Sequence, residues 1–524
     1  MTTNRRPLRF FYNRIPSFSL FFLIQVALLT WMVLEFQNQF YLFYAISLSL
    51  SVLVVLWIIT GDKNPTYKLA WVIPILLFPL FGGLMYLMVK QSKLRYGLGK
   101  RLPKLYKEAN ESLGKVIGEN PPAKVLRQEA PETYRESTYL TKVAMAPVYG
   151  NTQTQYFATG EEFLPAFINA LEQAQRYIFL EFFIIQEGVF WNQILSVLEQ
   201  KVHHGVEVRV LYDDAGCLTR LPRDYPKLLR AKGIQCSVFN PMTPIFNPML
   251  NHRDHRKIAV IDGMVGFTGG INLADEYINE YQILGYWKDC AIQLTGPGVV
   301  SLTRMFLVLW NATNKLPWDF NPYLPADREE NQPLLSKPIN PTLGFVQPFD
   351  DSPLDNERVG AGIYQSLISR AQETLYITTP YLILDNEMIN ALILAAKSGV
   401  DVRILTPKVP DKQWVHWVTQ SNYPVLLQAG VRIFEYSPGF IHGKMIVADN
   451  LTAVIGTINM DYRSLYLHFE CAVWLHGTQS VLDIQQDMVA TQDKSEEFTL
   501  ENYKKIPWTT RSLGKLLKIF AYLM

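Results

Sequence analysis

The sequence predicts an α/β fold of two similar lobes packed around one shared active site and preceded by an N-terminal α-helical membrane region. The motif His-x-Lys-x4-Asp occurs twice, at 255–262 and at 442–449. Around each copy, apolar strand-like runs alternate with helix-like patterns, which is typical of an α/β fold with a largely buried sheet. Three long apolar runs, 18–34, 40–59 and 69–89, come before both copies and approach the length that spans a bilayer.

The N-terminal part divides into a basic arm, residues 1–16, and a transmembrane region, residues 17–92, with two or three apolar segments. No small-residue cleavage site follows the first apolar run, so we do not expect a cleaved signal peptide. Three spans would divide the flanking basic residues almost evenly between the two sides, whereas either two-span arrangement gathers most of them on the cytoplasmic side. The number of spans stays open, and both two-span arrangements place the lobes in the cytoplasm.

The rest of the chain divides by composition and by the repeat. The predicted units are a linker with an amphipathic helix, 93–146, the first lobe, 147–318, an inter-lobe linker, 319–342, the second lobe, 343–491, and an amphipathic tail, 492–524. Basic and apolar positions alternate at helical spacing in the tail, which predicts a helix lying on anionic lipid. Packing of this tail against the lobes is the competing interpretation.

The two lobes are predicted to be an internal duplication. Seventeen residues after each motif histidine comes an asparagine, Asn272 in the first half and Asn459 in the second. Later in each half a carboxylate precedes a Cys-Ala pair, at Asp289 and at Glu470. The apolar run after each motif lysine fits a buried strand, and the motif aspartate then begins a tight turn into the next strand. Each half therefore offers a histidine, a lysine, an asparagine and a late carboxylate in one order.

These side chains suit transfer at a phosphodiester. Alternation along a strand places His255 with Lys257, and His442 with Lys444, on one face. A neutral imidazole can attack phosphorus and form a phosphohistidine, while a protonated one gives its proton to the leaving oxygen. The two lysines and the two asparagines would hold the non-bridging oxygens. The scheme needs no metal or other cofactor, and no Cys or carboxylate cluster completes a metal site around His252 and His255.

Four carboxylates accompany these groups. We expect Asp289 and Glu470 to orient the two histidines through their other ring nitrogen. Asp262 and Asp449 complete the motifs as candidate catalytic residues. A structural role is the favoured interpretation of these two aspartates, because the turn in which each one lies requires such a residue.

The paired motifs resemble the phospholipase D superfamily, and longer segments resemble bacterial cardiolipin synthases. These segments are Asn251–Lys257, Gly269–Tyr277, Thr379–Tyr381 and Gly456–Ser464, and the likeness runs from about residue 60 to near the C-terminus. The resemblance implies a pseudo-twofold bilobed domain with one active site, a phosphohistidine intermediate and no metal. It also implies that two phosphatidylglycerol molecules give cardiolipin and glycerol.

The resemblance further implies that His255 is the nucleophile and His442 the acid/base, although the near-symmetry of the site allows the reverse order. It favours the second and third apolar runs as membrane spans and a multi-pass protein of the bacterial cell membrane with a cytoplasmic catalytic domain. Three alternatives remain: a hydrolytic phospholipase D, a membrane-tethered nuclease with the same residues, and a membrane scaffold with a decayed site. Both intact motifs and both asparagines count against the scaffold.

The composition limits the classes of molecule that we expect this protein to bind. The formal net charge is only +2, so nothing in the overall charge favours nucleic acid, and we expect phosphatidylglycerol and anionic membrane lipid instead. The four cysteines have no ligand-like spacing, and buried thiols in a reduced, cytosolic setting fit them best. The sequence leaves the oligomeric state open.

Three short segments carry two interpretations each. Asp275–Tyr277 lies in a stretch where the first lobe is six residues longer than the second, and it either shapes the acceptor or glycerol pocket or begins a solvated helix. The aromatic residues of Trp414–Trp417 contact acyl chains or pack in the core. The apolar, turn-rich segment Pro241–Leu250 either dips into lipid or covers the site.

Overall fold

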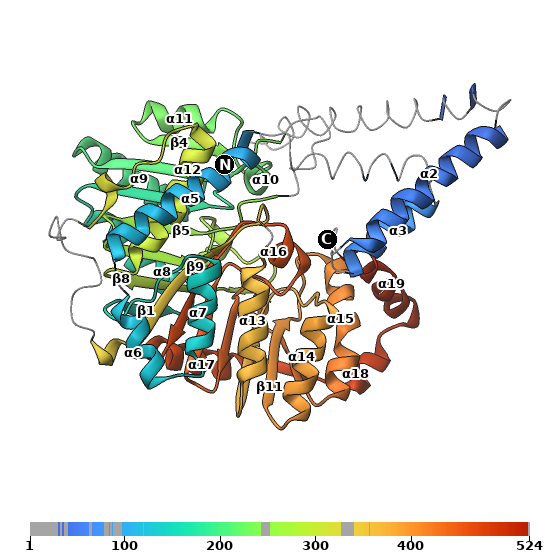
Figure 1. Cartoon of the computed structure of the whole chain (residues 1–524). Helices are drawn as coiled ribbons and strands as arrows, with labels where there is room; N and C mark the ends of the chain where they lie inside the picture. Colours follow the sequence, from blue (N-terminus) through green and yellow to red (C-terminus); the bar gives the residue numbers. More distant parts are fainter. Residues whose placement is uncertain are drawn as a thin grey trace, which may run out of the picture.

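The computed structural model describes most of the chain after residue 40. The described residues are 30, 31, 34, 35, 40–61, 65–77, 83, 86, 97–118, 120–242, 252–325, 340–355 and 357–521. Two sheet-based lobes make up most of the structure (Figure 1). Helices α2 (Phe40–Thr60) and α3 (Pro65–Leu77) pack against each other and stand out from these lobes (Figure 1).

The first lobe is built on a seven-stranded sheet in the order β1-β8-β6-β5-β2-β3-β4. Its strands are β1 (Gln153–Phe157), β2 (Tyr177–Phe182), β3 (Glu207–Asp213), β4 (Gln235–Phe239), β5 (Ile258–Ile261), β6 (Val265–Gly269) and β8 (Ala291–Thr295). Strands β2, β3 and β4 run parallel, while β5 and β6 form a hairpin. Its turn is formed by residues 262–264, in which Asp262 and Gly263 have positive φ angles of 53° and 70°.

The second lobe repeats this arrangement. Its sheet has the order β17-β12-β11-β10-β14-β15-β16-β9, so reading it backwards from β9 reproduces the first sheet strand by strand, with β17 added at the edge. The strands are β9 (Phe345–Asp351), β10 (Thr374–Thr378), β11 (Asp401–Pro407), β12 (Arg432–Tyr436), β14 (Met445–Ala448), β15 (Thr452–Gly456), β16 (Glu470–His476) and β17 (Ser495–Phe498). The prediction of an α/β fold with two similar lobes is confirmed.

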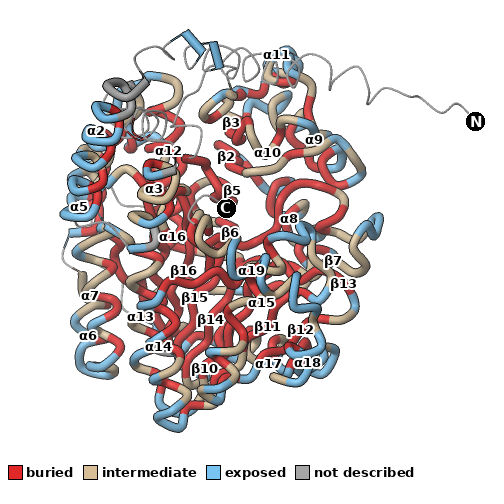
Figure 2. Tube along the Cα trace, turned by 90° about the vertical axis from the view of Figure 1, so that its right-hand side faces the viewer, coloured by how far each residue is buried: buried red, intermediate tan, exposed pale blue. Residues whose placement is uncertain are grey.

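Helices cover the outer faces of the sheets, and the central strands of both lobes are buried, whereas the edge strands β1 and β17 are partly exposed (Figure 2). In the first lobe these are α8 (Gly160–Glu172), α9 (Val189–His203), α10 (Asp214–Cys217) and α11 (Tyr225–Ala231), with the short η3 (Asp275–Ile278) and η4 (Asn321–Tyr323). In the second they are α13 (Val359–Arg370), α14 (Asn386–Lys397), α15 (Gln413–Gln428), α16 (Tyr462–Tyr466), α18 (Leu500–Lys505) and α19 (Trp508–Lys518), with η5 (Pro341–Leu343) before β9.

Two further helices lie where the lobes meet. Helix α12 (Val299–Asn314) packs on β5 of its own sheet and on β9 of the other, and α17 (Gln479–Gln492) packs on β14 and on β1. Residues 299–312 are all buried, which fits a helix that is covered on every side. One continuous apolar core therefore joins the two lobes.

The backbones of the lobes are also joined directly. Strand β7 (Tyr286–Lys288) of the first lobe pairs in parallel with β13 (Gly439–Ile441) of the second. A matching bridge links Asp254 to Phe469. These two connections are related by the same pseudo-twofold as the sheets, and each one ends next to a motif histidine.

The segment predicted as a linker with an amphipathic helix forms three helices that pack on both lobes. They are α5 (Gly97–Ile117), α6 (Pro121–Glu129) and α7 (Tyr134–Val143). Helix α5 lies on α12, whereas α7 packs on α13 and β9 of the second lobe. The Tyr106 hydroxyl of α5 donates a 2.8 Å hydrogen bond to Asp350 of β9. The chain therefore contacts the second lobe before it enters the first.

The described residues contain no helix that combines the length and the apolar character needed to cross a membrane. Of the predicted membrane runs, 18–34 lies almost wholly outside the described residues and 69–89 is described only in part. The N-terminal membrane region therefore stays a prediction. The segment Pro241–Leu250 also falls, from residue 243 on, outside the described residues.

Candidate active site

A cavity of about 630 Å³ lies between the lobes and brings the two motif histidines together. His255 and Asn272 line it from the first lobe, and His442 and Asn459 from the second. The predicted lysines and the two late carboxylates lie directly behind these four residues and are at most 2% exposed. Of the ten predicted site residues, eight therefore gather in one place.

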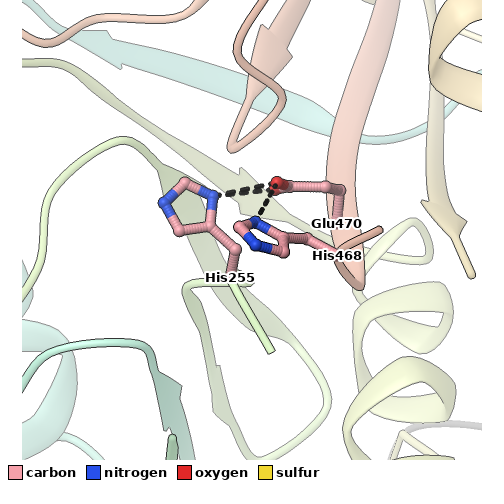
Figure 3. Close-up of side chains that lie close together, drawn as sticks. All are labelled: His255, His468 and Glu470. Carbon is pink, nitrogen blue, oxygen red and sulfur yellow. Dashed lines mark hydrogen bonds and ion pairs between the residues drawn. The ribbon is translucent and has the colours of Figure 1, made fainter. Parts of the chain in front are cut away.

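His255 lies just before β5 and is held at both its backbone and its ring. Its N–H donates to the carbonyl of Phe469 at 3.0 Å, and its Nδ1 lies 3.0 Å from both carboxylate oxygens of Glu470 (Figure 3). Burial, and then the positive charges of Lys257 and Lys444, hold the pKa of His255 well below its ordinary value. The ring is therefore neutral, with the proton on Nδ1 and a lone pair on Nε2.

His442 stands in the equivalent position of the second lobe. Its N–H donates to the carbonyl of Lys288 at 2.7 Å, and its Nδ1 lies 2.6 Å from Oδ2 of Asp289. Burial and the neighbouring Lys444 lower the pKa of His442 to about 4, and Asp289 opposes this shift. Both histidines thus use Nδ1 for a carboxylate and leave Nε2 for a substrate.

Each histidine takes its carboxylate from the other lobe. Glu470 begins β16 of the second lobe and reaches His255 of the first, while Asp289 follows β7 of the first lobe and reaches His442 of the second. The backbone connections between the lobes bring this about, because each one joins a histidine to the residue just before the opposite carboxylate. Neither half can form this pair of contacts alone.

The two lysines are equivalent as well. Lys257 Nζ donates to the carbonyl of His255 at 2.6 Å, and Lys444 Nζ donates to the carbonyl of His442. Burial lowers the pKa of Lys257 to about 7 and that of Lys444 to about 8. A phosphate in the cavity would raise both pKa values again, because it favours the charged ammonium.

The two asparagines differ. Both ends of the Asn272 amide have a partner: its Oδ1 accepts from the N–H of Ile184 at 3.0 Å, and its Nδ2 donates one of its two N–H groups to the Tyr277 hydroxyl at 2.8 Å. Asn459 is buried to the same extent, but no described residue donates to its Oδ1. The duplication is thus broken at this pair.

The structure does not bring Asp262 and Asp449 to the cavity, so their place in the candidate catalytic set is corrected. Each lies at the far end of a four-residue strand, β5 or β14, from its motif histidine. Asp262 accepts backbone hydrogen bonds at 2.7–2.8 Å from residues 175–177, and Asp449 at 2.8–3.1 Å from residues 372–374. These carboxylates fix the hairpin turns to the neighbouring strands.

His468 is a site residue that sequence reasoning missed. Its ring centroid lies 5.6 Å from that of His255, and its Nδ1 lies 3.7 Å from Glu470 (Figure 3). The signal was present in the repeat, since His468 stands two residues before Glu470 and Trp287 two residues before Asp289. Trp287 lies at the same centroid distance, 5.6 Å, from His442. The two half-sites therefore have different neighbours, one polar and one aromatic.

His255, His468 and Glu470 are close enough together to share a metal ion, because their ligand atoms lie within 4.8 Å of one another (Figure 3). A cation there would compete with the Nδ1–Glu470 hydrogen bond and would meet the charge of Lys257. The donor set fits a metal only at the expense of the histidine arrangement. His252 is not in this group, since its Nδ1 bonds the carbonyl of Leu467 at 2.9 Å.

Two α/β lobes that place paired His-x-Lys motifs at one cavity define a phospholipase D-like protein. Residues 167–282 and 364–491 match the family described as cardiolipin synthase, PLD-like domain. Residues 49–91 match the family described as phospholipase D-nuclease N-terminal. The crystal structure of a phosphatidylserine synthase from Haemophilus influenzae has the same fold, with a TM-score of 0.56 at 16% identity over 75% of this chain and 98% of that one.

Relatives that match most of this chain identify its family within the phospholipase D-like class. An uncharacterized protein of Streptococcus mutans is 42% identical over 471 residues, which are 90% of this chain and 99% of that protein. The cardiolipin synthase of Alkalihalophilus pseudofirmus is 33% identical over 88% of this chain and 90% of its own length. Cardiolipin synthase 2 of Bacillus cereus is 33% identical over 85% and 84%. The chain belongs to the cardiolipin synthase family.

Proposed function

We propose that this protein is a phosphatidyltransferase that makes cardiolipin from two phosphatidylglycerol molecules and releases glycerol. The observation that carries the proposal is the reciprocal arrangement of the histidines, each of which is neutral, is held by a carboxylate through Nδ1, and lines one common cavity. Two such imidazoles can serve as nucleophile and as acid/base on one phosphorus.

In the first step, Nε2 of His255 attacks the phosphorus of one phosphatidylglycerol and forms a phosphohistidine. The bond to the glycerol oxygen breaks, and the departing oxygen takes a proton from His442. Asp289 stabilises the protonated His442, and the anionic phosphodiester raises its pKa above the low value of the empty site. The Nδ1–Glu470 hydrogen bond keeps His255 in the tautomer that attacks.

In the second step, His442 accepts a proton from the terminal hydroxyl of a second phosphatidylglycerol. That oxygen attacks the phosphohistidine, the P–N bond breaks and cardiolipin forms. Through both steps Lys257 and Lys444, with the amides of Asn272 and Asn459, hold the non-bridging oxygens of the transferred phosphoryl group.

The order of the histidines has a direct test. In a His442→Ala variant, attack by His255 can still occur while the second step is blocked, so we expect a phosphatidyl group on His255 in peptide mass spectra after mixing with phosphatidylglycerol. The order would be reversed if the phosphatidyl group were found on His442 in a His255→Ala variant and not on His255 in the His442→Ala variant.

A lipid substrate is favoured over a nucleic acid by the walls of the cavity. Ile283, Trp287, Trp414 and Phe440 line it, and Ile283 and Trp414 are 72% and 39% exposed at its edge. An apolar rim suits acyl chains, whereas a polynucleotide needs a basic groove. The nuclease alternative is accordingly the weaker one.

The decisive experiment separates transfer from hydrolysis. Purified protein is mixed with phosphatidylglycerol micelles, and the products are measured as cardiolipin with glycerol or as phosphatidic acid. We expect cardiolipin with an equal amount of glycerol. Phosphatidic acid alone would make the protein a hydrolytic phospholipase D, in which water takes the place of the lipid hydroxyl.

We also propose that residues 17–92 hold the protein in the bacterial cell membrane as a multi-pass region, with the lobes in the cytoplasm. The apolar side chains that α2 exposes support this, among them Leu53 at 63% and Leu56 at 53%. Deleting residues 1–92 should move the protein from the membrane pellet to the soluble fraction. A full-length protein that is soluble without detergent would refute this proposal.

A further inference from the structure

We propose that Arg220 binds the phosphate of the acceptor phospholipid, which is the phosphodiester that is not cleaved. Arg220 would thereby make the enzyme prefer a phospholipid hydroxyl over a free alcohol. This inference rests on the proposed function, because it concerns the second phosphatidylglycerol of that reaction. It assigns a role to a residue outside both His-x-Lys motifs.

Arg220 is held rigidly at the wall of the cavity. It lies just after α10, and its Nη1 donates to Gln186 Oε1 at 2.5 Å and to Glu276 Oε1 at 2.6 Å. The Tyr281 hydroxyl donates to the other oxygen of Glu276 at 3.1 Å. Glu276 is only 4% exposed, so this carboxylate fixes one edge of the guanidinium from inside the protein.

The other edge of the guanidinium remains available. No described residue accepts a hydrogen bond from Nε or Nη2 of Arg220, and the side chain is 30% exposed where it lines the cavity. A planar guanidinium with two such donors matches two oxygens of a phosphodiester. Because Glu276 already restricts the side chain, less conformational freedom is lost when a phosphate binds.

The position of Arg220 also fits the chemistry of the acceptor. Glu276 belongs to η3, and the next residue, Tyr277, lies with its ring 5.6 Å from that of His442 and receives a hydrogen bond from Asn272. The hydroxyl that His442 activates is three carbon atoms away from the acceptor phosphate in phosphatidylglycerol. The segment that holds Arg220 is therefore next to the histidine that handles the acceptor hydroxyl.

The second lobe lines the cavity with a different set of charged residues. Helix η3 lies in the stretch where the first lobe is longer, and the charged residues that line the cavity from the second lobe are Asp411, Lys412, Asp461 and Arg463. Lys412 has a 53% exposed side chain and lies 3.3 Å from Asp411.

Two reactions of the same enzyme separate this role from the others. In the first, phosphatidylglycerol is converted to cardiolipin. In the second, labelled glycerol replaces the lipid acceptor and gives labelled phosphatidylglycerol, so the phosphohistidine forms and breaks without an acceptor phosphate. Arg220→Gln should lower cardiolipin formation about tenfold to hundredfold at low phosphatidylglycerol, as expected for a lost charge-assisted hydrogen bond, and should leave glycerol exchange within about twofold.

The matched control is Lys412→Gln. It also removes a cation from this cavity, but Lys412 is not held by a buried carboxylate as Arg220 is held by Glu276. It should leave both reactions within about twofold of the unchanged protein. Equal losses of both reactions in Arg220→Gln, or unchanged cardiolipin formation, would overturn the proposal. If Arg220→Gln is unstable because Glu276 loses its partner, the Arg220→Gln/Glu276→Gln double variant is tested by the same two assays and the same criteria.

Failure of the proposed function has a different signature. If the wild-type protein makes neither cardiolipin nor labelled phosphatidylglycerol, it has no phosphatidyltransferase activity, and this result does not depend on the residue at position 220. If the wild-type protein catalyses both cardiolipin formation and glycerol exchange, and Arg220→Gln catalyses only glycerol exchange, both proposals are supported.

Discussion

At the scale of single residues, the site depends on how its two histidines are oriented. Glu470 also accepts a hydrogen bond from the Thr457 hydroxyl, and Asp289 accepts one from the N–H of Cys290 at 2.8 Å. Each carboxylate is thus fixed within its own lobe as well as by the opposite histidine. A buried carboxylate held in this way determines which ring nitrogen carries the proton.

Replacing Glu470 with Gln should therefore lower kcat about 10²- to 10⁴-fold with little change in KM, because an amide no longer stabilises the attacking tautomer of His255. Cardiolipin formation under saturating phosphatidylglycerol measures this. Asp449→Asn is the control: it weakens a turn and should lower the melting temperature while kcat of the folded protein stays within about twofold. A Glu470→Gln enzyme with normal kcat would contradict the orienting role.

The lysines predict the pH dependence. Burial lowers the pKa of Lys257 to about 7 and that of Lys444 to about 8, so both are charged below these values and lose their charge as pH rises through them. His255 stays neutral at mildly acidic pH because its pKa is also depressed. We expect kcat/KM to fall as pH rises through about 7 to 8 and to hold down to about pH 6.

The same profile measured for kcat should have its alkaline limb at higher pH, because a bound phosphodiester favours the charged lysines. Vesicles of constant lipid composition keep the surface charge fixed during the titration. A kcat/KM that is constant from about pH 6 to about pH 9 would show that the lysine charges are not needed.

At the scale of elements, the C-terminal tail shows what periodicity can and cannot predict. The sequence indicates an amphipathic helix, and α19 is one, but lipid and the lobes were both possible partners for it. In the structure α19 lies along α15 (Figure 1), and Ala521 just after it joins an apolar cluster with Ile383 and Val415 of the cavity wall. Its outer face still exposes Trp508 at 71% and Leu516 at 55%.

Gly514 is the contact point of this packing, since a Cβ there would lie 2.5 Å from the carbonyl oxygen of Trp417. Gly514→Ala should weaken the packing of α19 by about 1–3 kcal/mol and raise KM for phosphatidylglycerol, because the helix supports the cavity wall. Limited proteolysis of the tail and the cardiolipin assay measure the two effects. Thr509→Ala, on the exposed face, should change neither, and a proteolytic pattern of Gly514→Ala equal to that of Thr509→Ala would contradict the packing.

At the scale of the whole molecule, the repeat predicted two similar α/β lobes and most of the motif residues at the cavity. It could not predict which lobe supplies which carboxylate, because the order His, Lys, Asn, carboxylate is the same whether the contacts form within a lobe or between lobes. The sequence predicted an amphipathic helix before the first lobe but not where such helices pack, for a similar reason: Leu126 and Leu140 are buried in the core of the second lobe. Local patterns carry no information about such distant partners.

Reciprocal contacts make the two lobes one catalytic unit, and this has a measurable consequence. If both histidines act on one phosphorus, His255→Ala and His442→Ala should each reduce cardiolipin formation by about 10³-fold or more. The double variant should be no worse than either single one, because removing one partner already disables the unit. Two independent sites would instead leave about half of the activity in each single variant.

Mixing the two single variants extends this test to the assembly. Each chain supplies both carboxylates and one intact histidine, and the shared apolar core keeps its lobes together. We therefore expect an equimolar mixture of His255→Ala and His442→Ala proteins to stay inactive, measured as cardiolipin formed after long co-incubation. Recovery of activity would mean that a first lobe can pair with the second lobe of another chain, which the continuous core and the paired strands β7 and β13 oppose.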